Sequence, residues 1–123
     1  MTIQEVIANV DELMPNQYST EQKIRWLSVL DGKIWHEVIL THMGPTMAYY
    51  PFDGYGSDDQ ELIVQPPYAE DLYGYYLKSR IAAENNEINK YDQFAAQFNQ
   101  AYEDWTGWYN RTHMPLTTGR WRM

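Results

Sequence analysis

The sequence predicts an all-α protein, a small bundle of about four helices with one long loop and an extended C-terminal tail. Apolar residues recur at helical spacing in four separate segments of the chain. Glycine and proline gather instead in residues 43–66, which show no helical period and therefore indicate a loop. The 123 residues suit one domain of ordinary size. We place this single helical domain at residues 1–115 and a flexible tail at residues 116–123.

The first two helices are predicted by the residues that begin and end them. Residues 2–14 open with a Thr-x-x-Glu capping pattern ahead of an apolar stripe, and a proline follows them. The second helix begins after Ser19 and runs to His42, with glycine and proline just beyond it. Gly32 inside this helix costs about 1 kcal/mol relative to alanine. We therefore expect either a neighbouring backbone packed against it or a bend in the helix.

The connection at residues 43–66 is unusually long for a compact domain. Its apolar run at residues 62–64 indicates either a brief strand or an extended arm. Connections of this length are usually functional or disordered. Because this one also carries three tyrosines and a phenylalanine, we expect it to become ordered against a partner.

Two further helices are expected beyond this loop. Pro67 suits the first position of the third helix. The pair Asn85-Asn86 favours a turn, because asparagine tolerates left-handed geometry, and one continuous helix over residues 67–112 is the alternative. The fourth helix starts at Glu87, spans about 25 residues and roughly 38 Å, and matches the second in length, so we expect these two to pack side by side throughout. Its stripe is Ile88, Tyr91, Phe94, Phe98, Tyr102, Trp105 and Tyr109.

The composition favours contact with proteins over contact with nucleic acid or lipid. The seventeen acidic residues outnumber the nine basic ones, and the resulting negative electrostatic field repels phosphate backbones and anionic membranes. There is no cysteine, no secretion signal and no apolar stretch near the roughly 20 residues that span a bilayer, so we expect a soluble cytoplasmic protein. Eleven tyrosines, five tryptophans and three phenylalanines suit protein interfaces, or else are amphipathic rings at the surface.

Residue types that catalyse reactions or bind metals do not form a site in the sequence. His36 and His42 lie on different faces of a helix, and His113 stands at a helix end, where a cation is favourable in any case. The acidic run from Asp53 departs from a calcium loop, because a tyrosine takes the place of the third ligand and the sixth position lacks glycine. No nucleophile elbow, phosphate loop or dinucleotide motif occurs. We expect no catalytic residue, no metal and no cofactor.

Charge is separated along the chain. Residues 53–71 hold six acids and no lysine or arginine, whereas residues 111–123 hold three arginines and no acid. This polarity favours a head-to-tail contact, in which the tail of one copy meets the loop of the next. The alternative is that both segments are solvated or pair within one chain. The candidate interface residues are Tyr49, Tyr50, Phe52, Asp53, Tyr55, Asp58, Asp59, Arg111, Arg120, Trp121 and Arg122.

Several segments together resemble one known family. They are Pro15–Ser19, Lys23–Leu27, Leu30–Gly32, Pro67–Tyr68, Asp71–Tyr73, Glu87–Ile88 with Tyr91, Phe98–Asn99, Ala101–Tyr102 and Trp108–Pro115. This set resembles the head-completion or head-tail connector proteins of tailed bacteriophages and prophages, especially those of Gram-positive hosts. The resemblance covers most of the chain.

The resemblance implies a helical virion protein that joins a ring of about twelve copies on the portal vertex and extends the DNA channel toward the tail. Its partners would be its own copies, the portal protein and neighbouring connector or tail proteins, while DNA passes without sequence-specific binding and no membrane is involved. It would act at the head-tail interface and occupy the host cytoplasm during assembly. Another class remains open: a small helical adaptor or regulator of a bacterial host. A small hydrolase would need a buried pocket with shifted carboxylates or histidines.

Overall fold

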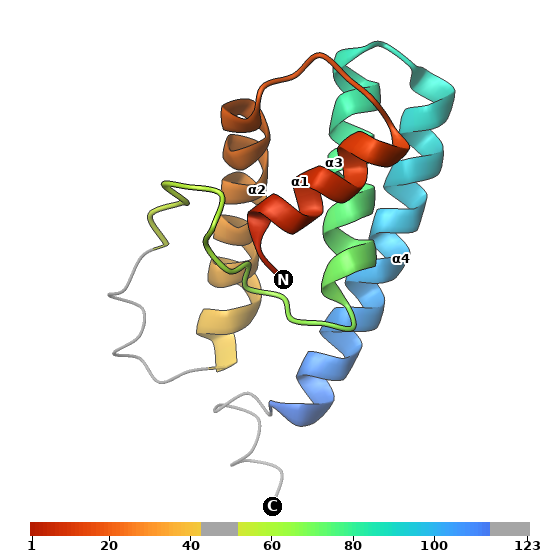
Figure 1. Cartoon of the computed structure of the whole chain (residues 1–123). Helices are drawn as coiled ribbons and strands as arrows, with labels where there is room; N and C mark the ends of the chain where they lie inside the picture. Colours follow the sequence, from red (N-terminus) through yellow and green to blue (C-terminus); the bar gives the residue numbers. More distant parts are fainter. Residues whose placement is uncertain (43–51, 114–123) are drawn as a thin grey trace, which may run out of the picture.

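The computed structural model describes residues 1–42 and 52–113, and these ranges form an all-α bundle of four α-helices without strands (Figure 1). The predicted fold class is confirmed. The helices are α1 (Ile3–Leu13), α2 (Thr20–Ile34), α3 (Ala69–Glu84) and α4 (Ile88–Thr112). A π-helical turn, η1 (Trp35–Ile39), and a 3-10 turn, η2 (Leu40–His42), continue directly from α2.

The predicted starts of the first two helices are confirmed. The Thr2 hydroxyl accepts a hydrogen bond from the Glu5 N–H at 3.2 Å, and the Glu5 carboxylate accepts one from the Thr2 N–H at 2.8 Å. Both halves of a capping box are therefore present. The Ser19 hydroxyl accepts a bond from the Gln22 N–H at 3.1 Å, which supplies one N–H of the first turn of α2 with a partner.

The sequence predicts a single α-helix from Ser19 to His42. The chain is helical over this range, but its last part is not an α-helix. The α-helical part ends at Ile34, and the chain then winds through η1 and η2 to His42. The expectation that a neighbouring backbone packs against Gly32 is wrong, because the nearest neighbour is the Phe52 side chain. A Cβ placed on Gly32 would lie 3.6 Å from the Phe52 ring. This is an ordinary van der Waals distance, so the packing of Phe52 does not require glycine at this position.

The third and fourth helices form an antiparallel hairpin, and two expectations about them are wrong. The chain turns at Asn86, which has a φ of +60°, so the predicted break between the helices is confirmed. However, α3 begins at Ala69 and not at Pro67. The main neighbour of α4 is α3, with which it runs side by side (Figure 1), and not α2. A short connection makes consecutive helices antiparallel neighbours, and this outweighs the match in length.

The core lies between α1, α2, η1, α3, the C-terminal half of α4 and residues 62–64. Leu62 and Val64 are 1% and 0% exposed. The apolar run is therefore an extended arm, and within the described residues the alternative of a strand is wrong, since only an isolated bridge joins Thr2 to Glu61. The arm contributes Leu62 and Val64 to the same core cluster as the helices.

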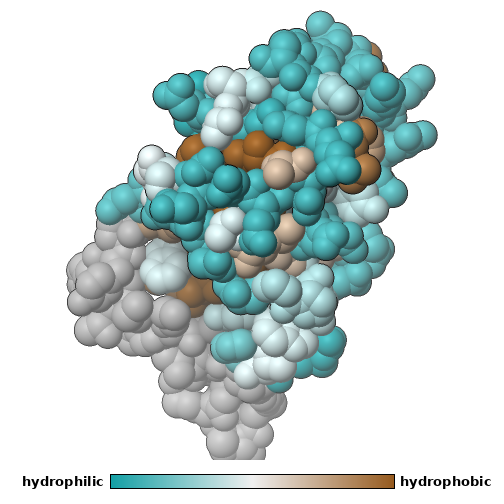
Figure 2. All heavy atoms as spheres, in the orientation of Figure 1, coloured by the Kyte–Doolittle hydropathy of each residue, from teal (hydrophilic) through white to brown (hydrophobic). Residues whose placement is uncertain are grey.

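The aromatic stripe of α4 is covered unevenly. Trp105 and Tyr109 are buried, whereas Ile88 and Tyr91 at the start of the helix are 71% and 40% exposed. The rings from Phe98 to Tyr109 follow one another at centroid distances between 5.3 and 6.1 Å. Much of the ring surface is thus covered by other rings of the same chain. The face shown in Figure 2 is mostly hydrophilic, with small apolar patches.

Candidate protein interface

A buried carboxylate ties residues 52–66, the described part of the long connection, to the helices. Asp31 of α2 has no exposed surface. One of its oxygens accepts a hydrogen bond from the Tyr73 hydroxyl at 2.6 Å. The other accepts bonds from the Tyr55 hydroxyl and from the Ile63 N–H, the latter at 3.2 Å. The Tyr73 hydroxyl in turn accepts a bond from the Val64 N–H at 2.9 Å. These hydrogen bonds among Asp31, Tyr55, Ile63, Val64 and Tyr73 form one network, which we call the anchor.

The electrostatics of this network suit an anchor rather than a reaction. Burial raises the pKa of Asp31, although its three hydrogen bonds act in the opposite direction. Burial and the nearby carboxylate also raise the pKa of Tyr55 and of Tyr73. Both hydroxyls therefore keep their protons at neutral pH and remain donors. Because Asp31 is completely buried, a substrate has no access to it.

The face of α2 around Asp31 packs against residues 52–55. Ser28 and Gly32 lie four residues apart and so share one helical face. The Ser28 hydroxyl accepts a hydrogen bond from the Tyr55 N–H at 3.0 Å. Gly54 lies against Ser28 with a φ of +91°, a conformation that glycine adopts without strain. Phe52 completes the contact over Gly32.

The next part of the segment pairs with the start of the chain. Three backbone hydrogen bonds run from the N–H groups of Ile3, Gln4 and Leu62 to the carbonyls of Gln60, Asp58 and Met1, at 3.1, 2.8 and 3.1 Å respectively. Two of the donors belong to the first turn of α1, where backbone N–H groups have no partner within the helix. The pairing therefore satisfies the start of α1 and fixes residues 58–62 at the same time.

The predicted loop residues fall into two groups in the structure. Phe52 and Tyr55 are half-buried and contact each other edge to face, with ring centroids 5.1 Å apart, and the Tyr55 hydroxyl belongs to the anchor. The carboxylates lie farther out: Asp53 and Asp59 are exposed, and Asp58 is half-buried. We call Asp53, Asp58, Asp59 and Glu61 the acidic edge. Because the anchor holds these residues on the bundle, the acidic edge is presented on a folded support.

The predicted basic partner is only partly within the described residues. Arg111 is exposed on the last turn of α4, with its guanidinium 3.5 Å from a Cβ placed on Gly107. Within residues 1–42 and 52–113, no ion pair joins Arg111 to the acidic edge. The other predicted interface residues lie outside the described residues; they are Tyr49, Tyr50, Arg120, Trp121 and Arg122. Their contact with a partner stays a prediction.

The segments that carry these remaining residues are attached at one end of the bundle. The end of η2 and the C-terminal end of α4 both lie at the lower end in Figure 1. Residues 43–51 continue from η2, and residues 114–123 continue from α4. Two predicted interface segments, far apart in sequence, therefore start from the same end of the molecule.

The histidines are not brought together in the part of the chain that the structure describes. His36 is exposed on η1, and His113 stacks on Tyr109 with ring centroids 4.0 Å apart. No group of three or more histidine, aspartate or glutamate side chains there could hold a metal ion. No described helix has the length and apolar character needed to cross a membrane.

The anchor itself was not predicted, although its sequence carried a signal. Asp31 interrupts the apolar stripe formed by Leu27, Leu30 and Ile34 on the second helix. A carboxylate on the buried face of a helix requires partners, because an unpaired buried charge is costly. That signal indicates a buried polar network, but it does not identify Tyr55 or Tyr73 as the donors.

Comparison of the chain with known protein families, with curated proteins and with solved structures finds no match. The resemblance to phage connector proteins therefore stays a prediction, and the geometry of the acidic edge and its anchor is what supports an interface.

Proposed function

We propose that this chain is a non-enzymatic structural subunit, a connector that assembles as a ring between the portal and the tail of a tailed phage. The observation that carries the proposal is the acidic edge, which a buried network anchors to a helical bundle. The same chain ends in a basic segment with Arg120 and Arg122. A molecule with an acidic surface and a basic extension can contact its own copies head to tail, and such contacts close into rings.

The net charge of −8 is compatible with a DNA-facing channel. An acidic lumen repels the phosphate backbone, so that DNA can pass without being held. In this proposal the portal protein and neighbouring connector or tail proteins are the remaining partners. The subunit would be part of the virion at the head-tail interface, after assembly in the host cytoplasm.

Native mass spectrometry of the full chain, alone and mixed with portal rings of the phage or prophage that encodes it, tests the proposal. We expect rings of the chain alone or a complex with the portal ring. If the chain forms a fixed small oligomer and does not bind portal rings, the result would support the alternative function, a helical adaptor or regulator of a bacterial host.

A charge-reversal pair tests the role of the tail. Changing Arg120 and Arg122 to Glu should weaken assembly and leave the helix content near normal, because the tail follows the last helix. The matched control changes Lys33 and Lys90 to Glu; both are exposed helical residues, so the net charge changes equally. If both double variants assemble like the parent chain, the tail has no part in the interface.

A further inference from the structure

The strongest unassigned feature is a groove between α1 and α3. Its cavity has a volume of about 400 Å³ and is lined by Asn9, Val10, Glu12, Leu13, Glu70, Asp71, Gly74, Tyr75 and Lys78. A volume of this size is within the range of roughly 300–1,000 Å³ that accommodates small ligands and large side chains. The acidic edge and the Asp31 anchor contribute nothing to it, so the groove is a separate surface.

The groove offers a large apolar side chain a place to bind. Leu13 at the end of α1 is 70% exposed, although a leucine normally gains from burial. Opposite it, a Cβ placed on Gly74 of α3 would meet nothing within 4 Å. The floor is Val10, which is 1% exposed. An aromatic or aliphatic side chain entering here would cover Leu13 and fill the space above Gly74.

The rim of the groove is acidic. Glu12, Glu70 and Asp71 are exposed there, and the only basic residue in the lining is Lys78. The Lys78 ammonium lies 5.5 Å from the Tyr75 ring centroid and is thus directed partly toward an aromatic face. The groove therefore favours an occupant with cationic side chains on either side of an apolar one.

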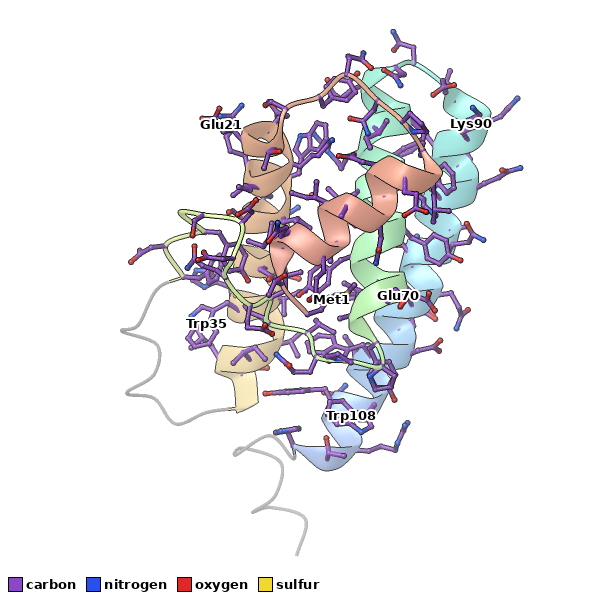
Figure 3. The ribbon with its side chains drawn as sticks, viewed as in Figure 1. Met1, Glu21, Trp35, Glu70, Lys90 and Trp108 are labelled. Atoms are coloured by element: carbon purple, nitrogen blue, oxygen red, sulfur yellow. The ribbon has the colours of Figure 1, made fainter. Side chains whose placement is uncertain are left out.

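A second cavity extends the groove toward the start of α3. It has a volume of about 470 Å³, shares Glu70 with the first cavity, and is otherwise lined by Met1, Glu5, Pro66 and Pro67. Met1 and Glu70, labelled in Figure 3, both line this second cavity. The surface can therefore receive an extended peptide rather than one isolated side chain.

The C-terminal segment of this chain has the complementary chemistry. Arg120-Trp121-Arg122 places an indole between two guanidinium groups. Arginine binds carboxylates through two parallel hydrogen bonds, and tryptophan is among the side chains that contribute most to interfaces. Trp121 is eight residues beyond His113, so a fully extended chain would allow it to reach up to roughly 28 Å from the end of α4, toward a neighbouring molecule.

We infer that the α1–α3 groove is the receptor for the C-terminal segment of a second copy, with Trp121 over Gly74 and Leu13. The two arginines then face Glu12, Glu70 and Asp71. This inference rests on the proposed function, because a ring requires one copy to donate what the next receives. It keeps the head-to-tail contact of the proposed ring but assigns the tail to this groove instead of to the acidic edge.

A labelled peptide of residues 111–123 tests the contact directly. The receptor is the full chain with Arg120→Glu, Trp121→Ser and Arg122→Glu, so that its own tail does not compete. We expect binding that weakens as salt rises, because charges contribute to it. Adding Gly74→Leu to the receptor should weaken binding by about 30-fold or more, as expected for the loss of one interface anchor.

The groove-filling substitution has a matched control at the same position. Gly74→Ala also replaces a helical glycine but leaves most of the groove open, and it should bind the peptide like the unaltered groove. Neither change should lower the melting temperature, because the added atoms enter open space and glycine is a poor helix former. Absence of peptide binding, or equal binding to the Leu and Ala variants, would overturn the inference.

A mixing experiment tests whether the segment comes from a second copy. The receptor with the altered tail keeps an unaltered groove. The full chain with Asp71→Lys and Gly74→Leu has an altered groove and keeps an unaltered tail. Each alone should lose the contact, whereas the mixture should form a one-to-one dimer in native mass spectrometry. Peptide binding without this dimer would show that each tail binds its own groove, which overturns the assignment to a second copy.

The outcomes separate this inference from the proposed connector. In one outcome, the peptide binds and mixed dimers form, but the chain forms no complex with portal rings. This outcome would support the groove contact and contradict the proposed connector function. Portal complexes that form normally with Gly74→Leu, together with no peptide binding, would support the connector and remove the groove contact.

Discussion

The Asp31 anchor leads to the sharpest prediction about this protein. Replacing Asp31 with alanine removes the acceptor of three hydrogen bonds, from the Tyr73 hydroxyl, the Tyr55 hydroxyl and the Ile63 N–H. Tyr73 is completely buried, so its hydroxyl has no water to replace the lost acceptor. Tyr55 and Ile63 are half-buried and can recover part of their hydrogen bonding from solvent.

The magnitude follows from the groups left without partners. A buried donor without an acceptor costs about 1–3 kcal/mol; the fully buried Tyr73 hydroxyl sets this scale, and the half-buried Tyr55 hydroxyl and Ile63 N–H add a smaller cost. Removing a desolvated carboxylate returns part of this cost. We therefore expect Asp31→Ala to lower the free energy of unfolding by about 3 kcal/mol, a large part of the 5–15 kcal/mol typical of a domain.

Urea denaturation, followed by tryptophan fluorescence and far-UV circular dichroism, measures this change. Tyr73→Phe removes one donor, and the double variant with Asp31→Ala should be less destabilised than the sum of the two single changes. For residues in direct contact, this coupling is about 0.5–3 kcal/mol. If Asp31→Ala changed stability by less than about 0.5 kcal/mol, like a surface substitution, the anchor would not hold the segment.

Three further predictions concern the core, the backbone and pH. Trp105→Ala should lower the free energy of unfolding by about 3–5 kcal/mol in the same assay, because Trp105 is 2% exposed; a change under about 1 kcal/mol would contradict its burial. Gly54→Ala should destabilise the protein by about 1–3 kcal/mol because of its φ of +91°, whereas Gly32→Ala should be neutral or stabilising, since a Cβ there meets the Phe52 ring at an ordinary 3.6 Å. Burial raises the pKa of Asp31 above 3.8, so its protonated form is favoured by folding. The stability of the parent chain relative to Asp31→Asn should therefore be highest below pH 3.8 and should fall as pH rises through the folded-state pKa; a rise over that range in urea titrations would reverse the reasoning.

The acidic edge could be predicted only as a charge pattern. Its aspartates are visible in the sequence as a run without lysine or arginine. The sequence does not show that the Tyr55 hydroxyl donates a hydrogen bond to a buried carboxylate. Nor does the pattern reveal the groove at Gly74, because a groove depends on how two helices approach each other. A glycine in a helix is compatible with a bend, a contact or an empty space.

The sequence alone determined where most helices begin and end, because these signals act over a few residues. The capping box at Thr2 and the turn at Asn86 are decided by neighbours in the chain. The tertiary structure decided the rest, since the donors to Asp31 are 24, 32 and 42 residues away along the chain. The neighbour of α4 also became known only from the tertiary structure. The short connection between α3 and α4 makes these consecutive helices adjacent, although α2 was expected to match α4 in length.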